Sequence, residues 1–171
     1  MIAPSAGALP GQPFVSDCEG GHSRVMGGRG DVRILIVDDE RELAEMLARR
    51  LALDGHEVHV CTDGWTAIQM ASLVEPDAIL TDLAMPGMDG WQLATRLREA
   101  LQPKHPLLIA ISAYQGDGDY VRSRTAGIDF HLGKPRYFEQ LRQILDRYAA
   151  SDHELELPAA SGGPSDAVPL S

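Results

Sequence analysis

Between residues 32 and 149, short apolar segments alternate with longer segments in which apolar residues recur every three or four positions. The short segments predict strands buried on both faces, and the longer pattern predicts helices with one buried side. The predicted strands are 32–37, 57–61, 78–81, 107–111 and 128–132, and the predicted helices are 40–53, 64–75, 90–101, 119–126 and 137–149. Right-handed crossovers between such strands place helices on both faces of a parallel sheet. The sequence therefore predicts an α/β fold with a five-stranded parallel sheet and five helices on both faces.

The segments on either side of this unit differ from it in composition. Residues 1–31 and 150–171 are rich in glycine, proline and serine and show no helical or strand period, and the second segment is also acidic. Segments of this kind cannot bury enough apolar surface to order themselves. We therefore expect a flexible N-terminal tail over 1–31, one domain over 32–149 and a flexible acidic C-terminal tail over 150–171.

Charge and composition exclude several classes of function. The net charge of −10 is unfavourable for binding nucleic acid or an anionic membrane surface. The two cysteines, Cys18 and Cys61, have no metal-ligand spacing and predict no disulfide scaffold. No apolar run reaches the roughly 18 residues of a membrane span, and the first residues do not resemble a signal peptide. We expect a cytoplasmic protein.

The helical periods also predict which side chains are buried. In the first helix, the inward face is expected to carry four apolar residues, Leu43, Met46, Leu47 and Leu51. Both tryptophans, Trp65 and Trp91, fall in predicted helices, where we expect them to be partly buried.

Polar side chains follow the predicted strands at the edge where a parallel sheet has its functional crevice. Asp38 and Asp39 follow the first strand, Asp82 follows the third, Ser112 ends the fourth and Lys134 follows the fifth. Two carboxylates about 4 Å apart repel each other by roughly 4 kcal/mol at an effective dielectric constant near 20. We therefore expect a positive group among these aspartates.

Each of these residues also has a structural interpretation. Asp39 and Glu42 have the spacing of a capping box at a helix start. Asp82 could form a local turn, Ser112 could be a locally bonded hydroxyl, and Lys134 precedes a proline that favours an exposed, extended loop. Each alternative is reasonable alone, but together they require that all five polar residues fall at one edge of one sheet by coincidence.

Four segments, ILIVDDE, ILTDLAMPGMDG, IAISAY and AGIDFHLGKP, resemble the receiver domain of two-component response regulators in order and spacing. The resemblance spans residues 32–149 and implies a flavodoxin-like, doubly wound sheet with strand order 2-1-3-4-5. It implies that Asp82 is the phosphoacceptor, that Lys134 pairs with the bound phosphoryl group, and that Ser112 hydrogen-bonds it and draws in the following loop.

The same resemblance implies Mg²⁺ as cofactor. Asp39, Asp82 and the backbone carbonyl of Ala84 are the expected direct ligands, and Asp38 is expected to act largely through water. This agrees with the residue types, because Mg²⁺ prefers oxygen ligands in octahedral geometry. One position departs from the family pattern, since His131 occupies a place where many receivers carry an aromatic switch residue, and its role stays open.

The expected function is that of a stand-alone response regulator, which is not an enzyme beyond its own phosphorylation and dephosphorylation. The phosphoryl donor is expected to be a sensor histidine kinase or a histidine phosphotransfer protein, the downstream protein is unknown, and a homodimer is left open. One alternative is a phosphorylation-independent adaptor with the same fold. Another is an aspartyl-phosphate phosphatase, but that family carries DxD on the first strand, where this chain has adjacent Asp38 and Asp39.

Overall fold

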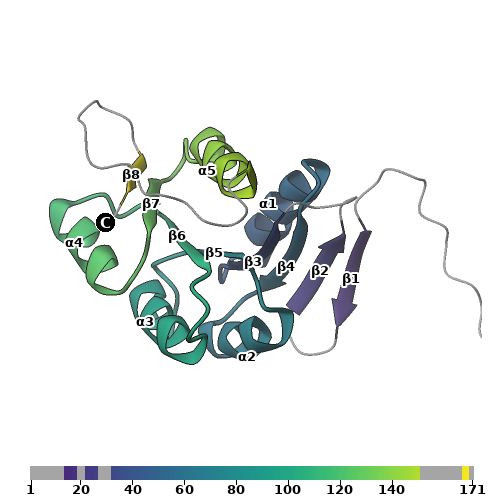
Figure 1. Ribbon diagram of the computed structural model, residues 1–171, viewed down its shortest axis with the longest axis horizontal. Helices are drawn as coiled ribbons and strands as arrows, with labels where there is room; N and C mark the ends of the chain where they lie inside the picture. The colour runs from purple at the N-terminus through teal and green to yellow at the C-terminus, as the bar shows by residue number, and fades with distance from the viewer. Residues whose placement is uncertain (1–13, 19–21, 27–31, 151–166, 170–171) are drawn as a thin grey trace, which may run out of the picture.

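The structure, a computed structural model, describes residues 14–18, 22–26, 32–150 and 167–169 (Figure 1). The strands are β1 (Phe14–Cys18), β2 (His22–Met26), β3 (Arg33–Val37), β4 (Glu57–Cys61), β5 (Ala78–Thr81), β6 (Leu107–Ser112), β7 (Phe130–Gly133) and β8 (Ala167–Pro169). The helices are α1 (Arg41–Leu53), α2 (Gly64–Val74), α3 (Gly90–Ala100), α4 (Asp117–Thr125) and α5 (Phe138–Ala150).

The centre of the sheet is parallel. The strand order is β1-β2-β4-β3-β5-β6-β7-β8, and the five strands from β4 to β7 run parallel. Counted from β3 as the first parallel strand, their order is 2-1-3-4-5, as predicted. Figure 1 shows α1 and α5 on one side of the sheet and α2 and α3 on the other. The predicted doubly wound fold is confirmed.

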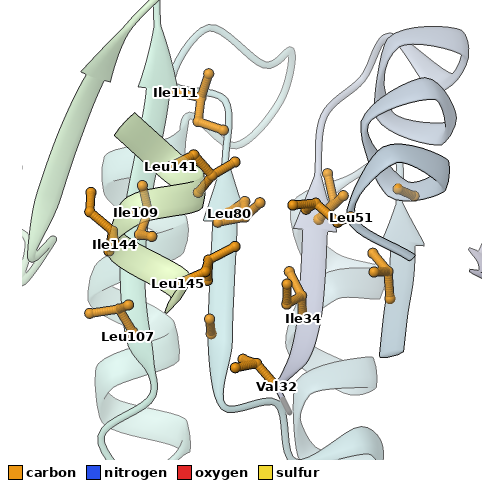
Figure 2. Close-up of a cluster of buried hydrophobic side chains, with 14 of the residues drawn as sticks. Val32, Ile34, Leu51, Leu80, Leu107, Ile109, Ile111, Leu141, Ile144 and Leu145 are labelled. Carbon is orange, nitrogen blue, oxygen red and sulfur yellow. The ribbon is translucent and has the colours of Figure 1, made fainter. Parts of the chain in front are cut away.

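Each face of the sheet has its own hydrophobic core, because successive strand residues point to opposite faces. In β3, Ile34 and Ile36 pack on the side of α1 and α5, and Leu35 and Val37 pack on the side of α2 and α3. Figure 2 shows the first core, in which strand residues meet side chains of α5, among them Leu80, Ile109, Leu141 and Leu145. Each fully buried side chain of this size contributes about 1.5–3 kcal/mol to stability.

The predicted elements between residues 32 and 150 all occur, with boundaries shifted by at most two residues. The predicted inward face of α1 is wrong in part, since Leu43 is 41% and Met46 63% exposed. The buried residues of α1 are instead Ala44, Ala48, Leu51 and Ala52. Small alanines let the helix backbone approach the sheet closely, which turns longer side chains outward. In the described ranges, the helices are too short or too polar to cross a membrane.

The two tryptophans differ in burial. Trp91 is 7% exposed and is therefore more fully buried than expected. Trp65 is 60% exposed and lies against the guanidinium of Arg96, which is 4.8 Å from its ring centroid. The expected burial of Trp65 is therefore wrong, because this side chain lies at the first turn of α2, outside the core.

Both outer edges of the parallel sheet carry strands for which the sequence showed no period. β1 and β2 form an antiparallel hairpin that pairs with β4, and β8 pairs antiparallel with β7. Edge strands expose unpaired backbone groups, and pairing with them does not require an alternating apolar pattern. Most residues of 1–31 and 151–171 lie outside the described residues, so their expected flexibility stays a prediction.

Gly90, at the start of α3, lies directly against the chain that follows β5. A Cβ atom at this position would meet the carbonyl oxygen of Asp82 and would lie 2.9 Å from the Cα atom of Leu83. The backbone N–H of Gly90 also donates a hydrogen bond to the carbonyl of Leu83 at 3.2 Å. The absence of a side chain here lets α3 support the backbone of Asp82.

We predict that Gly90→Ala lowers the free energy of unfolding by about 1–3 kcal/mol, because the added methyl group overlaps backbone atoms that cannot move freely. Urea denaturation followed by circular dichroism measures the change. The matched control is Gly118→Ala in α4, where no atom lies within 4 Å of the added Cβ. This control should be neutral or stabilising by up to about 1 kcal/mol. If both substitutions change the free energy of unfolding equally, the close approach of Gly90 to the backbone of Asp82 and Leu83 is contradicted.

Candidate functional site

Three of the predicted site residues meet at the carboxyl-terminal edge of the sheet. Asp38 follows β3, Asp82 follows β5 and Lys134 follows β7. The Nζ atom of Lys134 lies 2.8 Å from Oδ1 of Asp82 and 3.5 Å from Oδ2 of Asp38. Lys134 therefore supplies positive charge between these two aspartates.

Each of the two carboxylates is held by the backbone of its own loop. Oδ2 of Asp82 accepts a hydrogen bond from the N–H of Ala84 at 2.7 Å, and Oδ1 of Asp38 accepts one from the N–H of Glu40 at 2.9 Å. In both cases the donor lies two residues after the aspartate, so one oxygen is fixed locally and the other faces Lys134. This turn geometry is typical of Asp.

Burial and charge shift the pKa values at this site. Asp82 is only 8% exposed. Burial raises the pKa of Asp38 above its usual value, although the Glu40 amide and Lys134 act in the opposite direction. Burial alone would lower the pKa of Lys134, but its hydrogen bond to Asp82 and the charge of Asp38 outweigh burial and raise that pKa. Two carboxylates face one ammonium, so the site has capacity for further positive charge.

Asp39 differs from its neighbour. Its side chain is exposed, and the N-cap position of α1 is Glu40, which makes no side-chain capping bond. The structural interpretation of Asp39 as a helix cap is therefore wrong. Within the described residues, no three His, Cys, Asp or Glu side chains are close enough to form a preassembled metal site. Asp38 and Asp82 converge, but Asp39 does not join them in this conformation.

Ser112 and His131 lie on the side of the site toward α4. Ser112 is 1% exposed, its hydroxyl accepts a hydrogen bond from the N–H of Tyr114 at 3.0 Å, and its carbonyl accepts one from the N–H of Lys134 at 2.9 Å. His131 is fully buried in β7, and burial lowers the pKa of its imidazole. Ser112 is thus tied by hydrogen bonds to both neighbouring loops.

An apolar cavity of about 680 Å³ opens beside the charged residues, between α1 and the start of α5. Its lining includes Asp38, Asp82 and Lys134, together with the large apolar side chains Leu43, Met46, Leu47 and Phe138. Its volume is in the range of ligand-binding pockets. The sequence pattern did not indicate this cavity, because the helical period placed Leu43 and Met46 inside the core. A run of alanines at the sheet-facing positions of α1 is the signal that could have revealed it.

The chain was compared with protein families and known proteins. Residues 34–146 match the family model of the response regulator receiver domain. The response regulator PleD of Caulobacter vibrioides is 35% identical over 134 residues, which cover 76% of this chain and 29% of that protein. The response regulator MprA of Mycobacterium ulcerans is 35% identical over 127 residues, which cover 72% of this chain and 54% of that protein. The chain thus spans about half or less of the length of these relatives.

Solved structures agree with these matches. The receiver domain of a DNA-binding response regulator from Colwellia psychrerythraea has a TM-score of 0.64 and 26% sequence identity, and the alignment covers 69% of this chain and 98% of that one. The family model matches most of the chain, and the fold agrees with it. The chain therefore belongs to the response regulator receiver domain family.

Proposed function

We propose that Asp82 accepts a phosphoryl group from a phosphohistidine of a sensor histidine kinase or a histidine phosphotransfer protein. The observation that carries this proposal is the carboxylate of Asp82, which is buried at the sheet edge between Lys134 and the backbone N–H of Ala84. A carboxylate oxygen would attack phosphorus, the bond from phosphorus to the imidazole nitrogen would break, and its electron pair would remain on that nitrogen. Such transfer depends mainly on positioning and charge neutralisation.

The residues at the site fit Mg²⁺ as the cofactor by the chemistry of their donor atoms. Asp38 and Asp82 present carboxylate oxygens to a common cation position, and Asp39 is free of capping bonds in the next position of the chain. We propose Asp39, Asp82 and the carbonyl of Ala84 as direct ligands, with Asp38 acting through water. When bound, the ion would neutralise charge on the carboxylates and on the incoming phosphoryl oxygens.

Lys134 and Ser112 have separate roles in this proposal. The ammonium of Lys134 already contacts the reactive oxygen atom of Asp82, so a small movement would place it against a bound phosphoryl group. The hydroxyl of Ser112 accepts a bond from Tyr114 and still has its own hydrogen to donate to a phosphoryl oxygen. Phosphorylation would thereby change a local charge and pull on the loop after β6.

The apolar cavity offers a docking surface for the phosphodonor. Met46 and Leu43 are exposed along α1, and Phe138 at the start of α5 lies under the guanidinium of Arg50, 5.0 Å from the ring centroid. An amphipathic helix could bury its apolar side here while it presents a phosphohistidine to Asp82. This surface is formed by α1 and α5 and does not include α4. A phosphodonor and a downstream protein could therefore bind to separate faces. An adaptor that ignores phosphorylation stays the alternative.

We predict that acetyl phosphate with Mg²⁺ adds one phosphoryl group to the protein and that Asp82→Asn abolishes the addition, because the amide is not a nucleophile. Intact-mass spectrometry measures the product. Asp63→Asn is the matched control, since Asp63 caps α2 through the N–H of Thr66 and lies outside the site. Undiminished labelling of Asp82→Asn would refute the assignment.

For the metal, we predict that Asp39→Ala weakens Mg²⁺ binding more than Asp38→Ala, because only Asp39 is proposed as a direct ligand. Calorimetric titration of the three proteins gives the order of affinities. Glu42→Ala serves as control for removal of an exposed acidic side chain from the same helix start. Equal losses, or a greater loss for Asp38→Ala, would show that the proposed ligand set is wrong.

A third prediction separates phosphorylation from the response to it. Ser112→Ala and Lys134→Ala should still accept a phosphoryl group, because neither side chain is the nucleophile. Both should lose most of the change in residues 113–132, since one charge-assisted hydrogen bond contributes about 1.5–3 kcal/mol to the shifted state. Hydrogen exchange with and without beryllofluoride tests this. If both variants respond to beryllofluoride as the wild type does, Ser112 and Lys134 do not couple the site to residues 113–132.

A further inference from the structure

The loop between β5 and α3, residues 82–89, is anchored by two buried methionines. Met85 is 7% and Met88 is 4% exposed, and both belong to the core on the side of α2 and α3. Between them, Gly87 has a positive φ of 81°, a conformation that glycine adopts without strain and that turns the chain sharply. Ala84, on the same loop, is exposed. The loop therefore carries a proposed site residue on its outer side and an apolar anchor on its inner side.

Met88 lies against the start of α2, where Gly64 leaves room for its side chain. The two helices α2 and α3 lie side by side on one face of the sheet (Figure 1). A Cβ atom added at Gly64 would lie 2.7 Å from Sδ, 3.2 Å from Cγ and 3.3 Å from Cβ of Met88. The thioether thus occupies the space that a side chain at residue 64 would need. Met88 connects the loop to α2 through a contact that requires glycine at this position.

The base of the loop is closed by backbone contacts. The N–H of Gly90 donates a hydrogen bond to the carbonyl of Leu83 at 3.2 Å, so the segment between these two residues forms a short closed loop. Within this loop, the N–H of Ala84 donates to Oδ2 of Asp82 at 2.7 Å. Because the loop is short and its base is fixed, a displacement of Met88 is transmitted to the backbone of Ala84.

We propose that Met88 is a positioning residue for the phosphorylation site, and that its contact with Gly64 fixes Ala84 and, through it, the carboxylate of Asp82. The consequence for the metal rests on the proposed function, in which the carbonyl of Ala84 is a ligand of Mg²⁺. Groups that orient metal ligands contribute to metal affinity although they do not touch the metal. Displacement of Met88 therefore weakens Mg²⁺ binding and slows phosphorylation while every acidic side chain is still present.

Gly64→Ala tests the contact without changing the loop itself. The backbone of Gly64 does not lie in the left-handed region, so alanine fits it, and the flexible side chain of Met88 has to move instead. In nuclear magnetic resonance spectra of the metal-free full chain, the backbone amide signal of Ala84 should shift in this variant. Gly118→Ala, whose added Cβ meets no described atom within 4 Å, is the matched control and should leave the signal in place. An unmoved Ala84 signal in Gly64→Ala would overturn the proposal.

Calorimetric titration with Mg²⁺ measures the consequence for the site. Met88→Ala and Gly64→Ala should each weaken Mg²⁺ binding roughly tenfold. Met88→Leu, which keeps the buried volume, should retain most of the affinity. In a Met88→Ala background, Gly64→Ala should cause no further loss, because the side chain that it displaces is already absent. If Gly64→Ala weakens binding equally in both backgrounds, Met88 does not transmit the effect and the proposal is contradicted.

Ile144→Val distinguishes positioning from a loss of stability. Ile144 is buried in the core on the opposite face of the sheet, so its truncation should lower the free energy of unfolding and leave Mg²⁺ affinity unchanged. If Met88→Ala is destabilised and binds Mg²⁺ as tightly as the wild type, Met88 only fills the core and the proposal is overturned. If Met88→Ala does not fold, Met88→Val, which removes the thioether but keeps a buried apolar side chain, replaces it in every comparison.

The positioning role and the proposed function fail separately. If acetyl phosphate with Mg²⁺ does not modify Asp82, the proposed function is contradicted, and the Ala84 signal of metal-free Gly64→Ala still decides whether Met88 positions the loop. If the wild type is phosphorylated, and Gly64→Ala and Met88→Ala match its Mg²⁺ affinity and its rate of phosphorylation, the positioning role is overturned while the function stands.

Discussion

The contact of the Lys134 ammonium with the carboxylates of Asp82 and Asp38 connects three strands that are far apart in the sequence. It exists because β3, β5 and β7 run parallel and end at the same edge of the sheet. One ammonium cannot neutralise two carboxylates, and burial increases the cost of the uncompensated charge. The site is therefore prepared for further positive charge, and a phosphoryl group bound there would redistribute all of these contacts.

The helices around this edge are held by different forces. α1 and α5 bury apolar side chains on one face of the sheet, whereas α4 buries only the hydroxyl of Ser123. Local unfolding and movement occur most readily where few apolar contacts are buried. The cores therefore fix the positions of Asp38, Asp82 and Lys134, whereas α4 is held mainly by polar and aromatic contacts. A rigid site beside a weakly packed helix is consistent with the proposed phosphorylation-controlled binding surface.

Particular residues show where sequence patterns were sufficient. The apolar runs of β3 and β6 identified buried parallel strands, since residues on both of their faces lie in a core. The apolar period of α1 predicted the wrong buried face in part, because alanines pack against the sheet there and Met46 points outward. Asp39 had the spacing of a capping residue, but the N-cap position of α1 is one residue later, at Glu40. The strands β1, β2 and β8 pair through backbone groups, which leave no side-chain period to detect.

The sequence by itself determined the order of strands and helices, the identity of the family, and the convergence of Asp38, Asp82 and Lys134 at one edge. The order of elements and the convergence follow from local periodicity and from the geometry of parallel crossovers, and the family follows from the resemblance of four segments to receiver domains. Only the tertiary structure decided which side of α1 is buried, that Lys134 contacts both Asp82 and Asp38, and that Ser123 joins Trp91 to His131. Such contacts depend on distances and side-chain directions between elements distant in the chain, which no local pattern encodes.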